Sequence, residues 1–316
     1  RDSSTSRGLG DVYKRQAIDG KPFVQQYPID ADEPLFKKEI SATDLWKKIV
    51  HNAWKSAEPG VLFWDTILRE SVPDCYADLG YRTVSTNPCG EIPLCPYDSC
   101  RLLAINLYSY VVNPFKPDAY FDFDLFKKHV ALAQRIMDDI IDLELEKIER
   151  IMAKIDSDPE NEDVKHTESV LWQKIYKKSG QGRRTGVGIT AEGDMLAALG
   201  LRYGTEEATE FAEKVHQTVA LSAYRSSVEM AKERGAFEVY DSEREKNNPF
   251  INRLREADPE LYEEMKKYGR RNIACLTIAP TGTTSLMTQT TSGIEPVFLP
   301  VYKRRRKVNP NDANVH

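Results

Sequence analysis

The 316-residue sequence lacks most features that would place it in a membrane, in an oxidising compartment or on nucleic acid. It has no apolar run of transmembrane length and no signal-peptide pattern. Its five cysteines are few and odd in number, which argues against a disulfide-held fold and favours a reducing, cytoplasmic setting. The net charge of −5 gives no general positive field. We therefore expect no direct binding to nucleic acid or membranes.

Several common site motifs are also missing. The cysteines form no C-x-x-C pair and no histidine lies near them, so we expect no metal site. The chain has no Gly-Lys-Ser/Thr sequence, which disfavours a P-loop nucleoside triphosphatase. Gly186 and Gly188 lack the third glycine of a dinucleotide-binding fingerprint, and we interpret them as sites of close packing. The basic run at 303–307 could bind nucleic acid, but without a basic stripe elsewhere we interpret it as a solvated segment.

The two ends of the chain differ from the rest. Residues 1–16 are polar and show no hydrophobic period, so we expect a disordered tail that resembles a translated sequencing adaptor; an ordinary flexible tail is the alternative. The chain does not begin with methionine, and residues 309–314 carry no helix or strand signal. We expect a fragment of a longer protein, with residues 17–316 as one partial domain.

Helical periodicity is clear in three segments. Apolar residues recur at helical spacing over 44–54, 124–155 and 206–234, and Gly235 is placed to end the last of these helices. A heptad coiled coil is the alternative for 124–155. The polar stretch 156–167 after it is interpreted as a surface excursion rather than a domain boundary.

Short apolar runs between the helices indicate strands. Residues 61–68 predict a strand or turn, while 82–86 and 102–112 predict strands that enter and leave one central segment. The run 273–279 stops at Pro280 and predicts a buried strand that feeds a turn. Strands separated by long helices favour an α/β fold.

The central segment, Asn87-Pro-Cys-Gly-Glu91, combines an amide, a thiol and a carboxylate. If it is extended, Asn87, Cys89 and Glu91 share one face and could contact one small ligand. A strand end with one buried cysteine is the alternative. A second candidate is Pro280-Thr-Gly-Thr-Thr-Ser285, where a turn and hydroxyl groups precede a helix. It could be an anion site or an ordinary helix cap.

Three blocks of sequence resemble the ribonucleotide reductase large chain, in the same order. They are Asn87-Pro-Cys-Gly-Glu-Ile-Pro-Leu-Cys-Pro-Tyr-Asp-Ser-Cys100, Gly182-Arg-Arg-Thr-Gly-Val-Gly-Ile189, and Ala279-Pro-Thr-Gly-Thr-Thr-Ser285 with Thr291-Ser-Gly-Ile-Glu-Pro-Val-Phe298. The resemblance covers residue 17 to the end. It implies part of a ten-stranded α/β barrel with a central finger loop that carries the active cysteine.

The resemblance also implies roles for individual residues. Cys89 matches the cysteine that forms a thiyl radical, Glu91 the general base for the 3′-hydroxyl proton, and Asn87 the amide that binds the substrate. Cys100 matches one member of the reducing pair, whose partner would lie upstream, so the chain alone is not expected to turn over. The residues that match the binders of substrate phosphates are Thr281, Gly282, Thr283, Thr284 and Ser285. Cys95 has no family role, and we expect it to be a buried structural residue.

The form of the finger suggests the radical source. Asn-Pro-Cys-Gly-Glu resembles the adenosylcobalamin-dependent class II enzymes, which implies an adenosylcobalamin cofactor, an external thioredoxin-like dithiol reductant and a ribonucleotide substrate, with diphosphates favoured. A homodimer is possible for the complete protein. The alternatives are a class I large chain with a separate di-metal radical subunit, a non-catalytic helical scaffold, and a glycyl-radical enzyme, whose glycine signature is not visible.

Overall fold

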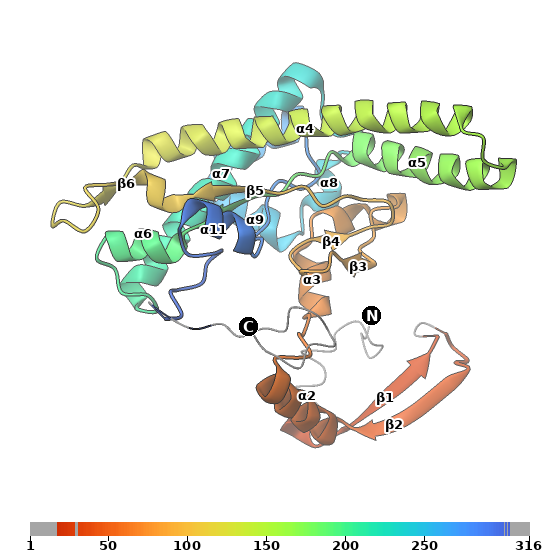
Figure 1. Ribbon diagram of the computed structural model, residues 1–316, viewed down its shortest axis with the longest axis horizontal. Coiled ribbons are helices and arrows are strands. Elements are labelled where there is room, and N and C mark those ends of the chain that lie inside the picture. The colour runs from red at the N-terminus through yellow and green to blue at the C-terminus, as the bar shows by residue number, and fades with distance from the viewer. Residues whose placement is uncertain (1–17, 29–30, 300, 302, 304–316) are drawn as a thin grey trace.

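The computed structural model describes residues 18–28, 31–299, 301 and 303 (Figure 1). The expected tail at 1–16 and all of the basic run except Lys303 lie outside these residues. The elements are, in chain order, β1 (Pro22–Tyr27), β2 (Phe36–Ser41), α2 (Ala42–Ser56), α3 (Trp64–Glu70), η1 (Pro73–Leu79), β3 (Ser85–Thr86), β4 (Pro93–Leu94), β5 (Leu103–Asn106), η2 (Leu107–Tyr110), β6 (Val111–Val112), β7 (Tyr120–Phe121), α4 (Phe123–Ser157), α5 (Glu162–Gly182), β8 (Val187–Thr190), α6 (Glu192–Ala198), α7 (Glu206–Arg234), α8 (Ser242–Glu245), α9 (Pro249–Ala257), α10 (Pro259–Tyr268) and α11 (Gly282–Thr288).

A small unit at the start of the described chain consists of the antiparallel hairpin β1–β2 and helix α2. Phe23 and Ala42 form its buried centre. The Ser41 side chain accepts a hydrogen bond from the Asp44 backbone N–H at 3.2 Å and so caps α2. This confirms the predicted helix at 44–54. Figure 1 shows the hairpin lying away from the larger body that contains the other helices.

The long helices form the framework of that larger body. Helices α4 and α7 fall where the apolar periodicity predicts them, and α4 packs against both α5 and α7 (Figure 1). The Ser226 hydroxyl donates to the Ala131 backbone oxygen at 2.8 Å, a contact that small residues on α7 allow. The stretch 156–167 lies at the surface, as predicted, but it is a short turn between two helices rather than a long excursion. The chain turns within a few residues, and Asn161 caps α5 through the Val164 backbone N–H.

The sheet beneath α4 and α7 is short. Strand β5 runs parallel to β8, with Leu103 paired to Val187. The predicted strand at 273–279 lies along the other edge of β8, but only Leu276 forms a bridge, with Val187. The predicted strand at 102–112 is shorter than expected, because the four residues of β5 are followed by the 3-10 turn η2.

Gly186 and Gly188 permit this close strand arrangement. A Cβ at 186 would lie 2.4 Å from the Arg101 backbone oxygen, and a Cβ at 188 would lie 2.1 Å from that of Thr277. Neither position can carry a side chain without separation of the segments. Their interpretation as packing glycines is therefore confirmed.

The apolar core lies between the sheet and the helices that cover it. It includes Ile105, Ile189, Met137, Val215 and Val219, all buried. The fold is α/β, as expected, but the described residues form no closed barrel. None of the described helices is both long and apolar enough to cross a bilayer.

Two shorter predictions need correction. Residues 61–68 form no strand; they enter helix α3. Of the predicted strand at 82–86, only Ser85–Thr86 pairs, with Pro93–Leu94. Both segments are short, and the pattern of a few apolar residues does not distinguish strand from helix or coil.

Candidate functional site

The finger is the turn of a hairpin rather than an extended strand. Strands β3 and β4 pair on either side of residues 87–92, and the Gly90 backbone N–H donates to the Asn87 oxygen at 3.0 Å. The Asn87 side-chain oxygen accepts from the Ile92 N–H, also at 3.0 Å. Gly90 has φ of +82°, which disfavours any residue with a Cβ. The expected single extended face of Asn87, Cys89 and Glu91 is therefore wrong, because the chain reverses at this point.

A cavity of about 320 Å³ brings the finger and the hydroxyl loop together. Its size is within the range of pockets that hold small ligands. Cys89 and Glu91 line it together with residues 281–284, which are about 190 positions later in the sequence. The residues that line it are Cys89, Glu91, Leu102, Leu103, Ala104, Gly186, Gly188, Ile189, Thr277, Ala279, Pro280, Thr281, Gly282, Thr283 and Thr284.

The two thiols and the carboxylate at the finger interact with one another. Cys89 and Cys100 are both exposed free thiols. Partial burial raises the pKa of Cys100, and the charges of Glu91 and Cys89 raise it further. The Asn87 amide nitrogen contacts the Cys100 sulfur at 3.9 Å. Asn87 and Cys100 are thus next to the cavity residues, although neither lines the cavity itself.

Glu91 has an unused acceptor. Its Oε2 atom is buried and has no hydrogen-bond partner among the described residues. A buried carboxylate oxygen without a donor is unfavourable by about 1–3 kcal/mol or more. Because Glu91 lines the cavity, a ligand hydroxyl there could supply the missing donor.

The hydroxyl loop begins helix α11, as predicted, but its side chains have different surroundings. The Thr281 hydroxyl accepts from the Gly293 N–H at 2.6 Å and contacts the Thr190 hydroxyl at 3.1 Å. Ser285 is only 7% exposed, donates to the Gly282 oxygen at 2.8 Å and does not line the cavity. Among the described residues, the hydroxyls of Thr283 and Thr284 have no partner, and both residues line the cavity.

Thr277 is a cavity residue that the sequence did not single out. Its hydroxyl donates to the Glu91 backbone oxygen at 3.0 Å and joins the finger to the segment 273–279. The only local signal is alternation, since 277 and 279 share one face of an extended segment and both line the cavity. Contact with the finger depends on tertiary structure.

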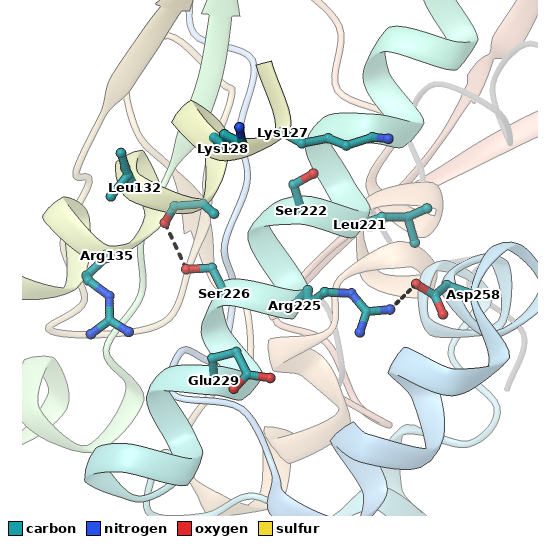
Figure 2. Close-up of a pocket in the computed structure, with 11 residues that line it drawn as sticks. Lys127, Lys128, Leu132, Arg135, Leu221, Ser222, Arg225, Ser226, Glu229 and Asp258 are labelled. Atoms are coloured by element: carbon teal, nitrogen blue, oxygen red, sulfur yellow. Dashed lines mark hydrogen bonds and ion pairs between the residues drawn. The ribbon is translucent and has the colours of Figure 1, made fainter. Parts of the chain in front are cut away.

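A second, larger cavity of about 910 Å³ lies elsewhere, between α4 and α7. Figure 2 shows Arg225 from α7 turned toward Asp258, with their ion pair at 2.5 Å. Arg135, on the other side, is paired with Glu233. This groove holds none of the residues predicted for the site, and its two arginines are already neutralised.

Comparison with known proteins gives a consistent result. The ribonucleotide reductase barrel-domain family matches residues 3–314. The chain is 35% identical over 280 residues to a vitamin B12-dependent ribonucleoside-diphosphate reductase of Thermoplasma acidophilum, which covers 87% of this chain and 30% of the relative. A Mycobacterium tuberculosis protein of the same name is 31% identical over 267 residues, 84% of this chain and 31% of the relative.

Other relatives have different names. A Chlamydia pneumoniae ribonucleoside-diphosphate reductase subunit alpha is 26% identical over 316 residues, 92% of this chain and 27% of the relative. The class Id ribonucleotide reductase alpha subunit of Actinobacillus ureae has a similar fold, with a TM-score of 0.56 and 20% identity over 81% of this chain and 39% of that one. The chain thus spans about a third of the length of the curated relatives it matches.

Proposed function

Because the chain belongs to the barrel-domain family of ribonucleotide reductases, we propose that the complete protein reduces ribonucleotides to 2′-deoxyribonucleotides through a cysteine thiyl radical. The observation that supports this most strongly is the shared cavity. Cys89 and Glu91 line it together with Thr283 and Thr284, so one nucleotide could present its sugar to the finger and its phosphates to the loop.

Radical chemistry answers a specific difficulty of this reaction. The hydroxyl at C2′ is a poor leaving group from an unactivated carbon. In the proposed mechanism the Cys89 sulfur radical takes the hydrogen atom from C3′, and Glu91 accepts the proton of the 3′-hydroxyl. Water is then lost from C2′. Two cysteine thiols, one of them Cys100, supply two electrons and two protons and become a disulfide, and Cys89 returns the hydrogen atom to C3′.

The environment of Glu91 suits a base that meets a hydroxyl. Its buried, unpartnered Oε2 is an acceptor that the protein leaves free. The 3′-hydroxyl of a bound ribose would supply the donor. The backbone oxygen of the same residue accepts a hydrogen bond from Thr277, which restrains the main chain that carries the carboxylate.

We assign the substrate phosphates to the loop at 281–285, with the main contacts at Thr283, Thr284 and the backbone N–H groups of the first turn of α11. The hydroxyls of Thr281 and Ser285 already form hydrogen bonds with backbone groups of the protein. No lysine or arginine is among the residues that line the cavity. Names of relatives favour a diphosphate substrate.

The proposed radical source is adenosylcobalamin. It supplies a carbon-centred radical when bound, and a large cofactor requires an approachable cysteine. Cys89 is exposed, and a Cβ at its neighbour Gly90 would meet only the Leu62 side chain, at 3.5 Å. Cys89 is therefore accessible from outside, as the approach of such a group requires. The relatives with highest identity given above are named as vitamin B12-dependent.

Cys100 is proposed as one half of the reducing pair, regenerated by a thioredoxin-like dithiol. Cys95 and Cys275 are buried, and Cys75 is half-buried. None of these three suits exchange with an external reductant. We infer that the second reducing cysteine belongs to another part of the complete protein, which we propose to be a homodimer.

An assay of the full-length protein tests the radical source. With a ribonucleoside diphosphate, adenosylcobalamin and a dithiol as the only additions, deoxynucleotide is expected to form. The 5′-hydrogen of the cofactor is expected to exchange with solvent through the Cys89 thiol. Activity that needs an added metal-containing subunit, with none from cobalamin, would move the protein to class I.

A further inference from the structure

One side-chain hydrogen bond attaches the finger to the sheet. Within the described residues, the bond from the Thr277 hydroxyl to the Glu91 backbone oxygen, at 3.0 Å, is the only one that joins residues 87–92 to β5, β8 or the segment 273–279. We propose that Thr277 is the positioning residue of the finger and sets where the Cys89 thiol and the Glu91 carboxylate stand relative to the substrate. This inference rests on the proposed function.

Thr277 is itself held firmly. Its backbone N–H donates to the Val187 oxygen at 3.1 Å, and the residue is only 8% exposed. A Cβ at 186 would lie 2.8 Å from the Thr277 methyl group, and one at 188 would lie 2.1 Å from its backbone oxygen. The two glycines therefore let the segment 273–279 come close enough to β8 to place this hydroxyl at the finger.

The hydrogen bond from Thr277 meets the finger next to both of its proposed reactive residues. Glu91 carries the proposed base, and only Gly90 separates it from Cys89. The turn that carries both residues is closed by two backbone hydrogen bonds, from the Gly90 N–H to the Asn87 oxygen and from the Asn87 N–H to the Ile92 oxygen. Fixing the Glu91 carbonyl therefore restrains the backbone from which both reactive side chains extend. The phosphate loop is attached separately, through Thr281 to Gly293.

Loss of the Thr277 hydroxyl is therefore expected to affect the chemical step more than binding. A misplacement of about 1 Å at reacting groups lowers rates by about 100-fold. We expect T277V to lower kcat by roughly 10- to 100-fold, with KM changed by less than about threefold because the phosphate contacts remain. T277S keeps the donor, and we expect it to recover most of the lost kcat.

The experiment compares three variants of the full-length protein: T277V, T277S and T218V. The Thr218 hydroxyl donates to the Lys214 oxygen at 2.8 Å on the exposed side of α7, so T218V removes a comparable bond far from the finger. Steady-state kcat and KM are measured for each, together with the melting temperature. Amide hydrogen exchange over residues 87–92, without substrate, reports directly on how the finger is held.

The expected result is faster exchange at 87–92 and reduced kcat in T277V alone, with the melting temperature close to wild type. Equal kcat and equal exchange in T277V and wild type would overturn the inference while the proposed function stands. An equal loss in T277S would also overturn it, because the hydroxyl would not be the cause. If wild type forms no deoxynucleotide, the proposed function fails, and the exchange rates still decide whether Thr277 holds the finger.

Discussion

Replacement of Gly188 by alanine is expected to separate β8 from the segment 273–279. The new Cβ would lie 2.1 Å from the Thr277 backbone oxygen, where no normal contact between heavy atoms is possible. That oxygen belongs to the main chain and cannot rotate away as the tip of a side chain can. The Thr277 N–H also donates to the Val187 oxygen at 3.1 Å, so a shift of the backbone would weaken this hydrogen bond as well.

The size of the destabilisation depends on the type of atom that the new Cβ would clash with. Added methyl groups in packed regions destabilise by about 1–3 kcal/mol, and a backbone clash belongs at the upper end. The entropic gain of glycine-to-alanine replacement, about 0.4–1 kcal/mol, offsets only part of this. We expect a net loss of about 2–3 kcal/mol. For a chain of 316 residues this lowers the melting temperature by roughly 3–5 °C.

Gly180 is a matched control within helix α5. A Cβ at this position would come no closer than 3.8 Å to another heavy atom, a methyl carbon of Leu145. Alanine is favoured over glycine inside a helix by about 1 kcal/mol, so G180A is expected to raise the melting temperature by about 1 °C. Scanning calorimetry of both variants measures the difference. The reasoning about close approach is refuted if G188A melts within 1 °C of wild type, or if both variants lose the same amount.

Three further predictions concern buried groups. The Arg270 guanidinium is fully buried and pairs with Glu245 at 2.5 Å. The variant R270M leaves the buried Glu245 carboxylate without its counter-ion and is expected to destabilise the protein by about 3–5 kcal/mol. Calorimetry should show a smaller loss of stability when Glu245 is also replaced by leucine. Burial raises the pKa of both Cys95 and Cys275 to about 12. Iodoacetamide near pH 8 is therefore expected to modify the exposed Cys89 first. Peptide mass spectrometry that finds Cys275 modified equally fast in the native protein would contradict this expectation. Because these two pKa values exceed the ordinary 9.0, folding favours the protonated thiols. The contribution of the two thiols to stability is complete below about pH 9 and declines toward about pH 12. Urea titrations that show greater stability at about pH 10.5 than at about pH 8 would refute this pH dependence.

The long helices were predictable from the sequence, whereas the short elements were not. Helices α4 and α7 have enough turns for an apolar stripe to define them. Helix α5 (Glu162–Gly182) is polar over most of its surface, and the polar stretch 156–167, which includes its first turns, gives no apolar stripe that predicts a helix. Helix α3 has seven residues, too few to distinguish a helix from a strand by pattern.

The candidate site residues come from motif resemblance, which does not give their geometry. Cys89, Glu91 and residues 281–284 line one cavity, while the expected extended finger is a turn that depends on the positive φ of Gly90. Thr277 has no sequence signal because its contact with Glu91 depends on the approach of two segments distant in sequence. The motif Gly186-Val-Gly188 permits that approach without naming the residue it accommodates.

The most direct test of the proposed thiyl role of Cys89 is a C89S variant of the full-length protein. Serine fills almost the same volume, so equilibrium dialysis is expected to show ribonucleotide affinity within about twofold of wild type. The hydroxyl does not readily form the corresponding radical, so a deoxynucleotide assay with adenosylcobalamin and a dithiol is expected to detect no product above background. Measurable turnover by C89S would contradict the account, and would favour a non-catalytic role for the finger.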